Sequence, residues 1–231
     1  MKEREDAMER TIKVTGRGRL LVKPDTVRLT MTLEGTELEY EKALEQSAHM
    51  SEQIKDLFVR MNFERESIKT QYFNVRTEYE GYSGKDGKWK QRFKGYTYTH
   101  RLKVEFPSNQ KRLGEILYAL GHAAVRPEIH IEYTVADPQK SKNELLAKAV
   151  SDAKQKAEVL ASAAGVPLGE LVSMDYSWGE LEFVTRPMQP MALQERCMSV
   201  DASENEAYAL DMEPEDIEVE DTVTMVWMIG V

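Results

Sequence analysis

Hydrophobic and polar side chains alternate along much of the chain, and a period of two residues is typical of strands with one buried face. The alternation is most regular where Val27, Leu29, Met31 and Leu33 are separated by polar residues. The same pattern predicts strands in other parts of the chain. These segments are 11–22, 68–82, 89–106, 129–135, 172–178 and 217–231.

Two segments between the predicted strands have helical periodicity. In 39–62, apolar residues recur at steps of three and four, which predicts an amphipathic helix. Asn109 is placed to cap a shorter helix that ends near Gly121, because its side chain accepts a hydrogen bond from a free backbone amide of the first turn.

A third helix is predicted to begin at Asp137-Pro138 and to end before Gly165, which tolerates the left-handed conformation at a helix end. Alanine recurs at helical spacing along it, so one face has little bulk and can approach another element closely. These alanines are Ala149, Ala153, Ala157, Ala161 and Ala164.

The order of elements predicts an α+β fold, with a mostly antiparallel sheet that includes a long hairpin and with helices packed on one face. A turn at 84–88 closes the hairpin, and a change of parity predicts a bulge near Tyr72. The last strand is apolar on both faces near its end, so we expect it in the middle of a sheet. We divide the chain into a charged N-terminal extension, 1–10, and a single domain, 11–231, with a flexible excursion at about 179–214.

The formal net charge is −9, but the acidity is confined to the C-terminal part. All 31 lysines and arginines precede residue 197, together with 30 of the 40 acidic residues. The charged N-terminus lacks the apolar stretch of a secretion signal, and no apolar run approaches the ~20 residues of a membrane span. With Cys197 as the single cysteine, we expect a cytoplasmic protein in a reducing compartment.

Several motifs in this order resemble the SIMPL domain family, which is also catalogued as a domain of unknown function (DUF541). They are Ile12 to Gly18 with Pro24-Asp25, Gly95-Tyr96, Ala149 to Ala161 with Gly165 and Leu168-Gly169, and Pro214-Glu215 with Val223-Thr224. The resemblance implies a bacterial protein linked to stress tolerance, although related members include exported proteins and an animal signalling adaptor. It also implies that ring-shaped assembly occurs among relatives, and it supplies no catalytic residue.

The sequence contains no catalytic motif. The four histidines lack metal-ligand spacing, and His100 is expected to be a satisfied, partly buried histidine on the same strand face as Tyr98 and Leu102. Gly16-Arg17-Gly18 has no third glycine and no following helix, so it is interpreted as a place where the strand bends. We therefore expect no enzyme activity, no cofactor and no metal. A weaker alternative is Cu(I) binding by the sulfur-bearing Met188, Met191, Cys197 and Met198.

The predicted interaction surface is the return strand of the hairpin, where basic and aromatic residues alternate. It comprises Lys88, Trp89, Lys90, Arg92, Phe93 and Lys94, and we expect it to meet the acidic Glu213, Glu215 and Asp216 of another subunit. Charge reversal of the hairpin cations should then weaken assembly.

The resulting hypothesis is a non-enzymatic, self-associating scaffold or binding protein that forms a homo-oligomer and accepts a further protein partner. One alternative is a small-ligand binder or an enzyme without a recognisable motif. Another is a single-stranded nucleic-acid binder that uses the basic and aromatic hairpin, although the net acidity opposes that partner.

Overall fold

The computed structural model describes residues 10–83, 89–176, 183–184 and 213–230. Within these residues the chain forms two compact units, which divide after Pro24 and after Thr134. The segment predicted as a single domain, 11–231, therefore contains two units, each with its own sheet and core. The predicted α+β class with antiparallel sheets is confirmed.

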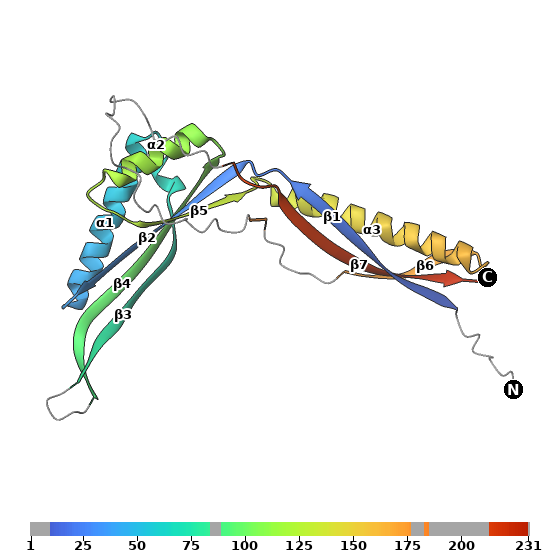
Figure 1. Ribbon diagram of the computed structural model, residues 1–231, viewed down its shortest axis with the longest axis horizontal. Helices are drawn as coiled ribbons and strands as arrows, with labels where there is room; N and C mark the ends of the chain where they lie inside the picture. Colours follow the sequence, from blue (N-terminus) through green and yellow to red (C-terminus); the bar gives the residue numbers. More distant parts are fainter. Residues whose placement is uncertain (1–9, 84–88, 177–182, 185–212, 231) are drawn as a thin grey trace. The chain divides into compact units, whose positions relative to one another are not determined.

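The three-stranded unit consists of three strands and one helix (Figure 1). Its elements are β1 (Thr11–Val22), α3 (Pro138–Ala163), β6 (Leu168–Asp175) and β7 (Ile217–Ile229), with sheet order β1-β7-β6. The C-terminal strand β7 thus lies in the middle of its sheet, as its apolar pattern predicts. The expected helix boundaries are also confirmed, because Asp137 accepts a hydrogen bond from the Lys140 amide and Gly165 has a φ of 70°.

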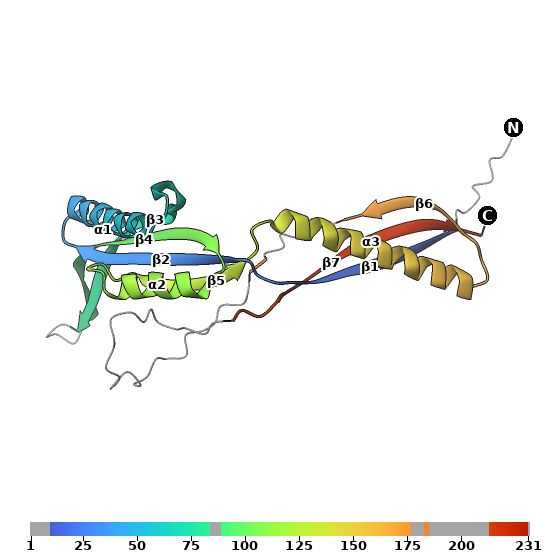
Figure 2. The same ribbon diagram turned by 90° about the horizontal axis from the view of Figure 1, so that it is seen from above.

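The alanine face of α3 packs directly on β1 and β7 (Figure 2). Ala149, Ala153 and Ala157 are completely buried, and Gly16 and Gly18 face them from β1. A Cβ atom on Gly16 would lie 2.1 Å from the backbone oxygen of Ala149. The interpretation of Gly16-Arg17-Gly18 as a bend needs correction, because β1 is continuous through both glycines and their role is to admit the helix backbone.

The four-stranded unit has the sheet order β3-β4-β2-β5, with two helices on one face (Figures 1 and 2). Its elements are β2 (Thr26–Glu37), α1 (Tyr40–Arg60), β3 (Lys69–Ser83), β4 (Trp89–Pro107), α2 (Gln110–Gly121) and β5 (Glu128–Thr134). A short 3-10 turn, Arg65–Ser67, leads into β3. The predicted Asn109 cap and the register shift next to Tyr72 are both confirmed.

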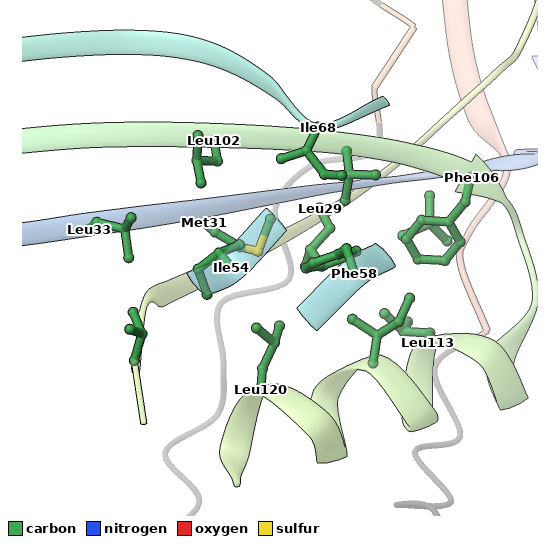
Figure 3. Packing of buried hydrophobic residues seen from close by; sticks show 14 of the residues in the cluster. Leu29, Met31, Leu33, Ile54, Phe58, Ile68, Leu102, Phe106, Leu113 and Leu120 are labelled. Atoms are coloured by element: carbon green, nitrogen blue, oxygen red, sulfur yellow. The ribbon is translucent and has the colours of Figure 1, made fainter. Parts of the chain in front are cut away.

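The core of this unit lies between the sheet and the helix pair (Figure 3). Leu29, Met31 and Leu33 of β2 point toward Phe58 of α1 and Leu120 of α2, and all five side chains are at most 1% exposed. Burial of a large aliphatic or aromatic side chain contributes about 1.5–3 kcal/mol to folding. The core therefore fixes the sheet on which the predicted interaction surface is built.

Candidate interaction surface

The predicted hairpin forms, and its distal part is a two-stranded ribbon. Trp89–Phe93 of β4 pair only with Tyr79–Ser83 of β3, because β2, the other neighbour of β4, ends at Glu37, opposite Tyr96. Trp89, Lys90, Arg92, Phe93 and Lys94 are described on this ribbon, whereas Lys88 lies outside the described residues, as does the predicted turn. Figure 1 shows β3 and β4 continuing together past the end of β2.

The ribbon gathers most of its aromatic residues on one face and its cations on the other, because successive side chains of a strand point to opposite faces; Tyr82 is the exception and lies opposite Lys90. On β4, Trp89, Phe93 and Tyr96 share the face that carries His100 and the helix-facing core. Arg92 lies on the opposite face and forms an ion pair of 2.6 Å with Glu80. The alternation in the sequence therefore forms an aromatic face and a second face that carries the cations together with Tyr82.

The aromatic face carries a chain of ring contacts that begins on α1. The centroids of Tyr40 and Tyr96 are 5.5 Å apart, those of Tyr96 and Phe93 are 5.3 Å apart, and those of Phe93 and Tyr79 are 6.1 Å apart. All three pairs meet edge to face, a favourable geometry for aromatic rings. We name these four residues, together with Trp89, the aromatic strip.

The aromatic strip is ordered by its own contacts and yet faces solvent. Trp89 is 73% exposed, and its ring lies against Gly81, where a Cβ atom would come within 2.4 Å of the indole. Tyr79, Tyr40 and Phe93 are 59%, 51% and 44% exposed. Contiguous exposed apolar surface of this kind marks a binding site in a folded protein.

The cations on the other face have partners on the neighbouring strand. Lys94 forms an ion pair of 2.9 Å with Glu78, which also accepts a hydrogen bond from Thr97. The hydrogen bonds from Thr97 and Lys94 lower the pKa of the Glu78 carboxyl, and Glu78 in turn raises the pKa of Lys94. The charges of Arg92 and Lys94 are therefore compensated by carboxylates within the ribbon.

The predicted acidic partners belong to another part of the chain. Glu213, Glu215 and Asp216 are exposed and precede β7. The next two carboxylates, Glu218 and Glu220, form ion pairs with Arg19 and Arg17 of β1. Contact between the hairpin cations and the acidic segment of a second subunit stays a prediction.

His100 is satisfied in the way the sequence predicts. Its Nδ1 is 3.1 Å from the Ser47 hydroxyl of α1, and its Nε2 is 3.0 Å from the Thr70 hydroxyl of β3. Ser47 is only 1% exposed, so the Nδ1 side of the imidazole is enclosed by the fold. Burial lowers the pKa of His100, and the positive charge of Lys55 lowers it further.

A groove of about 400 Å³ lies between α1 and the end of α2. Its polar lining includes Asp56, which accepts a 2.7 Å hydrogen bond from Arg65, and His122, whose Nδ1 is 2.9 Å from the Tyr118 carbonyl. These groups have partners within the fold and do not converge on a common point. Among the described residues no three metal-ligating side chains cluster, and no helix is long and apolar enough to cross a membrane. The four sulfur-bearing residues of the Cu(I) alternative lie outside the described residues.

Sequence reasoning missed half of the ribbon surface. Tyr40 and Tyr79 join the aromatic strip from α1 and β3, and Glu78 and Glu80 neutralise the cations from β3. Counting outward from the turn would pair Glu80 with Arg92. The same count reaches Glu78 and Lys94, which form an ion pair, although the register shift between Glu78 and Tyr79 places Glu78 opposite Gly95 in the ladder.

These features define an α+β protein with two antiparallel sheets and an aromatic ribbon that extends from one of them. The chain belongs to the SIMPL family, described as a protein of unknown function (DUF541), because the model of that family matches residues 12–227. The resemblance seen in the sequence is thereby confirmed. No curated protein matches the chain.

Proposed function

We propose that this protein is a non-enzymatic scaffold that self-associates through the ribbon of its four-stranded unit. The observation that carries the proposal is the aromatic strip, a set of contacting rings that remain exposed on a well-paired hairpin. Aromatic side chains in such a position contribute much of the free energy of protein–protein contacts. Homo-oligomer formation is the simplest use of this surface.

The separation of the two ribbon faces favours a protein partner over a nucleic acid. A single strand bound by base stacking needs aromatic rings and phosphate-binding cations along one groove. Here most of the rings lie on one face, whereas Arg92 and Lys94 are paired with carboxylates on the other face, which carries Tyr82 alone of the ribbon's rings. The ribbon cations then help to orient a partner more than they bind it.

The proposal is tested by the solution mass of a paired variant, measured by light scattering. Tyr79→Ser with Phe93→Ser should shift an oligomer toward the 26.5 kDa monomer, because both changes remove exposed rings without touching the core. Val159→Ser is the matched control, since Val159 is 61% exposed on α3 of the three-stranded unit, and it should leave the mass unchanged. An unchanged mass in the ring variant would contradict the proposal.

A further inference from the structure

Besides the aromatic strip, the outer edge of β3 is a second surface that is suited to binding a partner. β3 is an edge strand of 15 residues, and among the described strands it pairs only with β4. Four of its aromatic residues are at least 43% exposed: Tyr72, Phe73, Tyr79 and Tyr82. A long edge strand with exposed apolar side chains readily adds another strand, and natural proteins usually protect such edges.

The edge strand β1 of the three-stranded unit shows what such protection looks like in this same chain. The backbone amide of Arg17 donates a 2.7 Å hydrogen bond to the Asp152 carboxylate of α3. The Lys156 ammonium lies 3.4 Å from the Thr15 carbonyl, so α3 caps both kinds of backbone group on that edge. The described residues place no equivalent cap on β3, whose charged Arg76, Glu78 and Glu80 form ion pairs across the polar face of their own sheet.

The sequence of β3 is self-complementary when it is paired antiparallel with itself about Thr77. In that register Arg76 of each copy lies opposite Glu78 of the other, so two opposite-charge pairs form. On the helix-facing side, Val75 meets Tyr79, and Phe73 meets Gly81 and the Trp89 ring that covers it. On the polar side, Tyr72 meets Tyr82.

The neighbouring registers are worse on electrostatic grounds. Centring the pair on Arg76 places two arginines opposite each other. Centring it on Glu78 places Arg76 opposite Glu80 twice but also places two glutamates opposite each other, which the Thr77 register avoids. Centring it on Tyr79 places Glu78 opposite Glu80. Like charges directly opposite each other in a sheet are destabilising, so the Thr77 register is selected among these four.

We infer that the partner of this edge is a second copy of the chain, joined by antiparallel pairing of β3 with β3 about a twofold axis through Thr77. This inference rests on the proposed self-association and specifies its geometry. The contact is isologous, as in most homodimers. It joins two four-stranded sheets into one continuous sheet, with the helices of both copies on the same face.

Disulfide trapping tests the register, with Cys197→Ser as the background. Residues directly opposite each other lie about 5 Å apart, within reach of a disulfide, so Thr77→Cys should cross-link to its own copy. Val75→Cys and Tyr79→Cys should cross-link when mixed and not alone, because each is about 14 Å along the strand from its own copy. Val159→Cys on α3 measures the rate of chance collisions and should stay mostly unlinked.

Exchanging the charges of Arg76 and Glu78 gives a second test, in which the dissociation constant is measured for each variant alone and for the two variants mixed. Arg76→Glu and Glu78→Arg should each raise the dissociation constant about tenfold, since each places like charges opposite each other. Mixing the two variants restores both opposite-charge pairs, so the mixed dimer should regain nearly the wild-type affinity. A local role, in the 3.2 Å pair of Arg76 with Glu34 or the pair of Glu78 with Lys94, predicts no recovery on mixing.

The outcomes separate this inference from the proposed function. If the wild-type chain is oligomeric but Thr77→Cys links no faster than Val159→Cys, the β3 register is overturned and self-association stands. If the wild-type chain is monomeric by light scattering, both are overturned. Rapid linking of Thr77→Cys together with recovery on mixing supports the register.

Discussion

His100 illustrates how one polar side chain joins elements that are distant in the sequence. Both of its ring nitrogens have hydroxyl partners, Ser47 on α1 and Thr70 on β3, and the Phe73 ring meets the imidazole edge to face. The hydroxyls satisfy a partly buried group that would otherwise be costly to desolvate. This histidine therefore anchors the base of β3 to the helix layer.

The pH dependence of stability follows from this burial. The pKa of His100 is lowered from its ordinary 6.5, so the unfolded chain takes up this proton at a higher pH than the folded chain does. The free energy of unfolding should therefore decrease as the pH falls below about 6.5, and His100→Gln should make that decrease smaller. Urea denaturation at pH 8 and pH 5 measures the free energy of unfolding of the wild type and of the variant. The difference between the two proteins at pH 8, where the histidine is neutral, gives the cost of the lost contacts. An identical decrease in wild type and variant would contradict this explanation.

At the residue scale, the sequence predicts side-chain partners only within regular registers. It correctly predicts a satisfied His100, because one strand face carries Tyr98, His100 and Leu102 together. Counting outward from the turn also reaches the Lys94–Glu78 ion pair, but it does not place Gly95 opposite Glu78, because the register shifts between Glu78 and Tyr79. The change of parity predicts the shift next to Tyr72, whereas β3 keeps its alternation from Phe73 through Tyr79 and gives no sign of the second shift.

At the scale of elements, the closest packing is between α3 and β1. Gly18 would place a Cβ atom 2.2 Å from the Leu145 carbonyl oxygen, which matches the close approach at Gly16. The alanine face of the helix and the two glycines of β1 form one contact together. The alanine spacing in the sequence predicts that the helix can approach another element closely, but the sequence does not show that Gly16 and Gly18 are the residues it approaches.

Gly16→Ala should therefore destabilise the three-stranded unit strongly. The added methyl group meets backbone atoms of Ala149 and Ala153, which have no rotamer to yield, so we expect a loss of about 3 kcal/mol or more in the free energy of unfolding. Gly121→Ala is the matched control, because nothing lies within 4 Å of its Cβ position. Chemical denaturation compares the two, and equal stabilities would rule out the close helix–strand contact.

Among the properties of the helices and strands, the position of each strand in its sheet is the one that the sequence predicts least well. The central place of β7 follows from apolar residues on both of its faces. The edge position of β3 does not, since its alternating aromatic and polar residues are equally typical of a covered strand. Its exposure follows from the order in which the strands pair.

At the scale of the whole molecule, the chain combines two units with different uses of their edges. The three-stranded unit caps β1 with Asp152 and Lys156, and the hydrogen bonds from Lys156 and the Arg17 amide lower the pKa of Asp152. The four-stranded unit leaves β3 and the aromatic strip exposed. Composition along the chain does not separate the units, because the three-stranded unit is assembled from segments that are discontinuous in the sequence.

The division of the ribbon into an aromatic face and a charge-compensated face predicts how assembly responds to salt. Apolar contacts are little affected by ionic strength, whereas exposed ion pairs are screened. A ribbon-mediated oligomer should therefore persist in high salt, with slower association as the steering charges are screened. Full dissociation at high salt would instead favour pairing of the hairpin cations with Glu213, Glu215 and Asp216.

The most direct test of self-association is the mass of the unmodified chain by sedimentation equilibrium, over a range of concentrations at low and high salt. Self-association through the ribbon predicts a defined oligomer, an integer multiple of 26.5 kDa, that dissociates on dilution and is retained in high salt. A mass of 26.5 kDa at every concentration and salt level would contradict it.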